Sequence, residues 1–244
     1  MNQLHLAHMR AVPFENLDIT LGYPIALSVD SFLDKIVNRR RGGFCYELNS
    51  AFAWLLRELG FSVKFLTARV FKDEVPGPEF SHLLLQIKVE QTVIGDVGFG
   101  DSFLLPLVPG EHPCYQLDRF YQVLKENDLW TMRQKRHDDS WEPRYIFDMK
   151  PYQLDDFSTM CAYHQNSDMS IFTRSTVCSR ATRQGRVTYT NGRLILNDGI
   201  DRQETVVEDK KSLRDILQNH FDVYLSELEI ESLIAATDAQ ISFD

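Results

Sequence analysis

The segment Arg41–Asn49, with the sequence RGGFCYELN, constrains this chain most, because it places a cysteine in the first turn of a well-marked helix. Apolar residues recur at helical spacing up to Leu59, and Gly60 follows as a stop signal. We therefore expect a helix over Phe44–Leu59, with Cys45 at the positive end of its dipole.

Cys45 has two interpretations at this position. Free backbone N–H groups and the helix dipole favour the nucleophilic thiolate, and the preceding Gly42 and Gly43 leave room for a substrate to approach. Alternatively, Cys45 is a small buried core thiol, as free cysteines often are. The other cysteines lack a glycine-led helix start and are expected to be structural: Cys114, Cys161 and Cys178.

A nucleophilic cysteine needs a base and a group that orients the base. Residues 81–89 alternate as a strand with His82 on one face, and residues 92–97 follow as a second strand ending near Asp96. A three-residue loop between them sets Lys88 opposite Thr92 and puts His82 diagonal to Asp96 on the same face. A two-residue turn puts Asp96 on the opposite face, and the sequence leaves both registers open. Taken singly, His82 is also interpreted as an ordinary strand histidine, and Asp96 as a turn acid.

The glycines after Asp96 suggest a second contact site. Gly98 and Gly100 flank Phe99 and leave backbone N–H groups unobstructed, which suits close contact with a pyrophosphate. The same pattern is also common in simple turns, so by itself it is a weak signal.

Three segments occur in one order: RGGFCYELN, then SHLLL, then DVGFG. In this combination the chain resembles the arylamine N-acetyltransferase family. Val12–Asp18 (VPFENLD) resembles that family's early signature, and Phe172–Ser179 (FTRSTVCS) resembles it more weakly. The resemblance covers most of the chain.

The resemblance implies an α+β protein with a cysteine-protease-like Cys-His-Asp site. It implies a helical domain over residues 1–60, a β-barrel domain over 61–155 and an α/β lid over 156–244. The residue pattern agrees with this order. Helices are expected at Asn2–Val12, Asp30–Arg40, Ser212–Asn219 and Ser226–Ala236, strands dominate between 61 and 152, and Asn191-Gly192 marks a hairpin.

The resemblance also implies an activity. Cys45 takes an acetyl group from acetyl-coenzyme A and passes it, by a ping-pong route, to an arylamine, arylhydroxylamine or arylhydrazine. His82 is expected to move the protons, and Asp96 to hold its imidazole in the useful tautomer. From a different class, a transglutaminase-like enzyme or thiol hydrolase acting on amides has the same grouping. A silent coenzyme A or aryl-ligand binding protein is the third reading.

Binding residues follow from the same resemblance. Gly98, Phe99 and Gly100 are expected to approach coenzyme A, whereas the acceptor is expected to contact Phe14, Ser81, Phe99 and Phe103. Each phenylalanine is also a plausible core residue. The resemblance further implies an ion pair between Arg41 and Glu15, while Arg39 and Arg40 fit ordinary helix-end chemistry.

Composition limits the partners. A net charge of −9 argues against nucleic acid, and no apolar run reaches the length of a membrane span. The polar start and the scattered cysteines lead us to expect a cytoplasmic protein. We also expect a monomer or weak homo-oligomer. Cys161 and His164 have the spacing of half a metal site, but no second pair accompanies them, so we expect no metal.

Overall fold

The computed structural model describes residues 1–136 and 140–241. Its first region is mainly helical and contains α1 (Asn2–Ala11), β1 (Phe14–Glu15), α2 (Leu17–Thr20), α3 (Val29–Leu33) and α4 (Cys45–Glu58). The helices expected around α1 and α4 are confirmed to within one residue at each end. The helix expected at Asp30–Arg40 differs, because after α3 the chain continues as a π-helix over Asp34–Asn38.

A curled antiparallel sheet forms the middle of the chain. Its strands are β2 (Ser62–Lys72), β3 (Val75–Pro76), β4 (His82–Lys88), β5 (Thr92–Gly95), β6 (Cys114–Gln116), β7 (Arg119–Glu126), β8 (Leu129–Lys135) and β9 (Glu142–Phe147). The strand order is β5-β4-β2-β9-β8-β7-β6, with β3 paired to β2. Because β5 and β6 do not pair with each other in the described chain, this sheet is a curled half-barrel, and the expected β-barrel is confirmed only in part.

The last region combines helices with a second sheet. It contains a 3₁₀ helix (Leu154–Phe157), α5 (Ser158–Asn166), α6 (Ile171–Arg174), β10 (Val177–Ala181), β11 (Arg186–Thr190), β12 (Arg193–Asn197), β13 (Arg202–Val206), α7 (Lys210–Phe221) and α8 (Glu227–Ile241). The expected hairpin at Asn191-Gly192 is confirmed, since Thr190 pairs with Arg193. All pairings in this sheet are antiparallel, so the region is α+β rather than the expected α/β.

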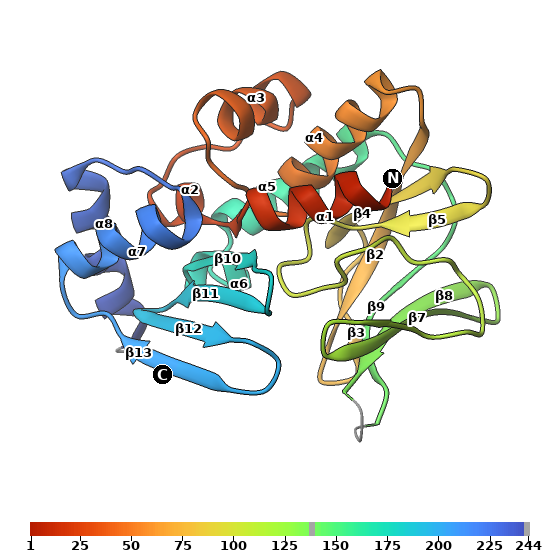
Figure 1. Ribbon diagram of the computed structural model, residues 1–244. Helices are drawn as coiled ribbons and strands as arrows, with labels where there is room; N and C mark the ends of the chain where they lie inside the picture. Colours follow the sequence, from red (N-terminus) through yellow and green to blue (C-terminus); the bar gives the residue numbers. More distant parts are fainter. Residues whose placement is uncertain (137–139, 242–244) are drawn as a thin grey trace.

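The first and last regions share a sheet. Strand β1 pairs with β10, where Phe14 lies opposite Ser179, and this gives the order β1-β10-β11-β12-β13. Figure 1 shows α1 and α4 above the two sheets, and α7 and α8 against the five-stranded one. The predicted boundaries near residues 60 and 155 therefore separate regions that interlock, and their independence as domains stays a prediction.

Strand β4 lies between two hydrophobic cores. Leu83 and Leu85 pack into the core that contains Phe52 of α4, whereas Leu84 packs into the core on the other face of the sheet. The alternation expected for residues 81–89 is therefore confirmed, but both faces are buried. A third core joins α7 and α8 to the five-stranded sheet.

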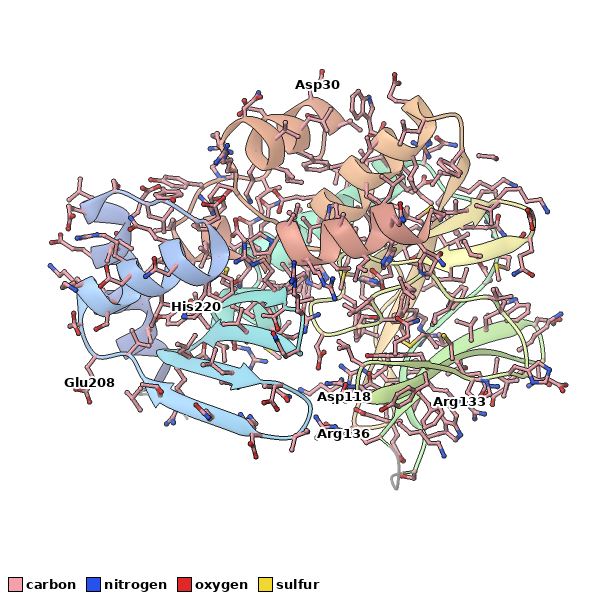
Figure 2. The ribbon with its side chains drawn as sticks, in the orientation of Figure 1. Asp30, Asp118, Arg133, Arg136, Glu208 and His220 are labelled. Carbon is pink, nitrogen blue, oxygen red and sulfur yellow. The ribbon has the colours of Figure 1, made fainter. Side chains whose placement is uncertain are left out.

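Ion pairs connect the two sheets. Asp101 accepts from Arg119 of β7 at 2.9 Å and lies 3.2 Å from Arg186 of β11. Asp118 faces Arg136 at the edge of the curled sheet that is nearest the β12–β13 hairpin (Figure 2). These charges fix the five-stranded sheet beside the curled one. In the described residues, no helix has the length and apolar character to cross a bilayer.

Candidate active site

Cys45 is the first residue of α4. The helix start is fixed by Glu47, whose Oε2 accepts the Phe44 N–H at 3.0 Å. At Gly43 an added Cβ would lie 2.6 Å from that carboxylate, so the position requires glycine. The first N–H groups of an α-helix have no intrahelical acceptors, and Cys45 lies in this first turn. Cys45 is 2% exposed as a residue, so it belongs to the core, and it also lines the cavity described below.

Asp96 lies beside His82, as only one of the two open registers allows. Lys88 pairs with Thr92 and Leu85 with Gly95, so the strands are joined by the three-residue connection at 89–91. Oδ2 of Asp96 is 2.8 Å from Nε2 of His82. The two-residue turn is excluded.

The Asp96 carboxylate is fully buried and held by several donors. Its Oδ1 accepts from Nδ2 of Asn49 at 3.0 Å and from the Gly98 N–H at 3.0 Å. Burial alone would raise the pKa of Asp96, but the charge of His82 and these hydrogen bonds outweigh it and lower the pKa. Asp96 is therefore a carboxylate at neutral pH.

His82 is correspondingly a strong base. Burial alone would lower its pKa, but Asp96 and the hydrogen bond with Cys45 outweigh that effect and raise the pKa to about 10. Nε2 faces Asp96, which leaves Nδ1 for the Cys45 sulfur. A protonated His82 therefore places a positive charge beside the Cys45 sulfur.

A cavity of about 400 Å³ opens beside Cys45 and His82. A volume in this range suits a small organic molecule. Most of its wall is apolar, and it includes four other residues assigned from the sequence: Phe14, Ser81, Gly98 and Phe99. The wall is completed by Val70, Arg144, His164, Ile171, Phe172, Ser175, Val177 and Thr190.

Two assigned residues lie elsewhere. Phe103 is fully buried in the core and stacks on the His5 ring at 5.7 Å, so its assignment to the acceptor pocket is corrected. Gly100, at φ +85, is not among the described residues of the cavity wall.

Gly98 lines the cavity, but its N–H, which we expected to be open to a pyrophosphate, donates to Asp96. An added Cβ at Gly98 would lie 2.7 Å from the Cα of Cys45. Gly98 is thus explained by close packing against α4.

Several residues around the site were not assigned from the sequence. Asn49 lies one turn after Cys45 on α4, and that i+4 spacing was the available signal. Its Oδ1 accepts the Val97 N–H at 3.0 Å, in addition to its donation to Asp96. His164 reaches the cavity from α5, and its Nε2 lies 3.3 Å from the Ser81 carbonyl oxygen. Nothing in the sequence linked His164 to Ser81.

His5 also supports Asp96. Its Nε2 accepts the Asp96 N–H at 3.2 Å, and its Nδ1 lies 2.8 Å from the Leu104 carbonyl oxygen. These partners require the tautomer with the proton on Nδ1. Burial is the main cause that lowers the pKa of His5 to about 4, so the ring is neutral at pH 7. Helix α1 therefore fixes the backbone of Asp96.

Five buried charged residues lie at the base of α4: Glu15, Asp18, Lys35, Arg41 and Glu47. The expected pair is confirmed, since Nε of Arg41 donates to Glu15 at 2.9 Å. Arg41 also binds Asp18 at 2.8 Å, and Lys35 binds Asp18 at 2.8 Å and Glu47 at 2.9 Å. The three acids and two bases together carry a formal charge of −1. Burial is the main cause that raises the pKa of Glu47 to about 7. The charge of Glu15 adds to this effect, and the charge of Lys35 opposes it.

A family model described as N-acetyltransferase matches residues 1–230 of the chain. Arylamine N-acetyltransferase 2 of Mesocricetus auratus is 31% identical over 89% of this chain and 84% of its own length. Arylamine N-acetyltransferase / N-hydroxyarylamine O-acetyltransferase of Salmonella typhimurium is 32% identical over 98% of this chain and 89% of its own length. The chain belongs to the arylamine N-acetyltransferase family.

Solved structures of arylamine N-acetyltransferases have the same fold. The Salmonella typhimurium structure superposes with a TM-score of 0.88 at 31% identity, covering 96% of this chain and 89% of that one. The Mycobacterium marinum enzyme in complex with CoA gives a TM-score of 0.87 at 26% identity, covering 97% and 91%. The mixed helix and sheet fold of the family is therefore established for this chain.

Proposed function

We propose that this chain moves an acetyl group from acetyl-coenzyme A to an aromatic amine, hydroxylamine or hydrazine through an acetyl-Cys45 intermediate. Family membership supports acetyl transfer, and the M. marinum complex supports coenzyme A as the donor. One observation carries the route: Cys45 lies beside His82, which binds Asp96 at 2.8 Å, on the wall of an apolar cavity.

In the first half-reaction, the Cys45 sulfur bonds to the acetyl carbonyl carbon and the donor's C–S bond breaks. Protonated His82 gives its proton to the departing sulfur. The free N–H groups in the first turn of α4 are the donors best placed to stabilise the oxyanion. The products are acetyl-Cys45, neutral His82 and free coenzyme A.

In the second half-reaction, the acceptor nitrogen bonds to the acetyl carbon and the bond to the Cys45 sulfur breaks. Neutral His82 takes the proton that the nitrogen loses, which restores the imidazolium and the thiolate. Asp96 stabilises the imidazolium in both steps and fixes its tautomer. Every proton is thus moved by His82.

The cavity supports an aromatic acceptor. Phe14 and Phe99 offer ring faces and edges to an aryl group, and Phe172 adds a third aromatic wall that the sequence had not assigned to it. Ser81 stays our proposed acceptor contact, and the segment Gly98–Gly100 stays the proposed approach path of the donor, through the cavity at Gly98 and Phe99. An aliphatic ammonium would lose its hydration here, and no carboxylate among the described wall residues would compensate for that loss.

Intact-mass spectrometry tests the proposal. Wild-type protein mixed with acetyl-coenzyme A should gain one acetyl group on Cys45, and an aniline should remove it as the acetanilide. Cys45→Ala should gain none, whereas Cys114→Ala should behave as wild type. If acetyl-Cys45 loses its acetyl group to water without amine as fast as it does with the aniline, a thiol hydrolase is supported. If transfer to a lysine peptide is faster than transfer to the aniline, a transglutaminase-like enzyme is supported. Binding without acetylation would leave only a ligand-binding protein.

A further inference from the structure

Among the residues that the structure describes, Arg144 is the one permanently charged side chain in the cavity wall. It lies on β9, and the other described residues of the wall include no lysine, no second arginine and no carboxylate. An apolar cavity with one guanidinium and no acid favours an anionic group on whatever binds there.

Arg144 stands close to the reacting groups. Its guanidinium carbon lies 5.3 Å from the centre of the Phe99 ring, and the Phe99 ring meets the His82 ring edge to face at 5.2 Å. The Phe99 ring therefore contacts both the Arg144 guanidinium and the His82 imidazole. A planar ligand against Phe99 would bring a substituent within reach of the guanidinium while its other end faced Cys45.

The charge of Arg144 is only partly compensated by the protein. Nη1 donates to Oε1 of Glu142 at 2.7 Å, but the Glu142 side chain is 58% exposed and such a pair is weak. Glu142 is the only carboxylate within 4 Å of it among the residues described. The buried Nε likewise finds no hydrogen-bond acceptor in that part of the chain.

We propose that Arg144 recognises an anionic group on a substrate of this site, either a carboxylate on the aromatic acceptor or a phosphate of the acyl donor. The proposal rests on the proposed function for its choice of ligands. A guanidinium presents paired N–H donors that match a carboxylate or a phosphate bidentately. Arg144 thus makes the cavity selective for charge as well as for aromaticity.

Binding of unreactive ligands tests this without any turnover. Isothermal titration would compare 4-methylbenzoate with 4-methylbenzamide, and coenzyme A with pantetheine, which lacks phosphate. The proteins would be wild type, Arg144→Gln, Arg144→Lys and the matched control Arg193→Gln, whose side chain is 55% exposed on β12. Far-ultraviolet circular dichroism and thermal unfolding would confirm that all four are folded.

Arg144→Gln should weaken binding of one anionic ligand by about tenfold or more and leave its neutral partner unchanged, with partial recovery in Arg144→Lys. Selective loss of 4-methylbenzoate identifies an acceptor carboxylate, and selective loss of coenzyme A identifies a donor phosphate. Equal effects on charged and neutral ligands, or the same loss in Arg193→Gln, would overturn the proposal. If wild type binds these ligands selectively but never forms acetyl-Cys45, the proposed function fails while the role of Arg144 stands.

Discussion

Nδ2 of Asn49 lies 3.0 Å from Oδ1 of Asp96, so the helix that begins with Cys45 also holds the carboxylate that orients His82. The same amide nitrogen donates to the Leu83 carbonyl oxygen at 2.7 Å. One asparagine therefore ties α4 to β4, where His82 lies, and to the end of β5. The relative positions of nucleophile, base and carboxylate depend on this side chain.

Replacing Asp96 by Asn should leave the fold intact and slow acetylation of Cys45 by roughly 100-fold or more, because the amide stabilises the wrong imidazole tautomer. Single-turnover acetylation measured by mass spectrometry checks this. Asp148→Asn, a half-buried acid that follows β9 and is not part of the cavity wall, is the control and should acetylate normally. Near-normal acetylation of folded Asp96→Asn would mean that another group orients His82.

Acetylation should stay fast up to high pH and fall as the pH rises through about 10, where His82 loses its proton. The sign follows from the raised pKa: the imidazolium that protonates the leaving sulfur persists below that value and is lost above it. Single-turnover rates measured between pH 6 and 10.5 give the pH at which acetylation decreases, which is the basic limb of the profile. A limb near the ordinary histidine pKa of 6.5 would contradict the assigned ion pair.

Two variants of His5 should behave differently. Gln places an acceptor near the position of Nε2 and should preserve the bond to the Asp96 N–H, whereas Asn mimics only the Nδ1 side of the ring. His5→Asn should therefore slow acetylation by about tenfold and move the basic limb to lower pH, because a displaced Asp96 stabilises the imidazolium less. His5→Gln should stay close to wild type. Identical profiles for the two variants would show that His5 only fills space.

The buried charge cluster should be sensitive to loss of one arginine. Arg41→Gln leaves three buried carboxylates to share Lys35, and should lower the free energy of unfolding by about 3–5 kcal/mol. Urea unfolding measures it. Arg39→Gln, whose side chain is 55% exposed, is the neighbouring control and should change stability by less than about 0.5 kcal/mol. Equal urea midpoints of unfolding for Arg41→Gln and Arg39→Gln would mean that the buried cluster contributes no net stability.

Local pattern predicted much of the site. The glycine-led helix start placed Cys45, and strand alternation with a short connection allowed the His82 and Asp96 pairing. Both signals extend over a few residues, where spacing determines geometry. The sequence left the register open because a turn of two or three residues was equally compatible with the strands, and only packing on both faces of β4 decides it.

Contacts between distant segments were beyond such reasoning. His5 contacts Asp96, which is 91 residues away in the sequence. Lys35 lies in a π-helix that the hydrophobic spacing did not indicate, and from there it forms ion pairs with Asp18 and Glu47. The assignment of Phe103 to the acceptor pocket was wrong for a related reason: proximity in sequence to Asp96 does not determine the direction of a side chain. Burial, rather than spacing, places these residues.

Strand β1 has a consequence for how the chain folds. Phe14 must pair with Ser179, yet it also bridges to Gly43 just before the helix of Cys45. Closing so long a loop is slow, and during synthesis the partner strand emerges more than a hundred residues after β1. We expect the amino-terminal region to wait on the ribosome with this edge unpaired, so that the nucleophile acquires its final surroundings only when most of the chain has been made.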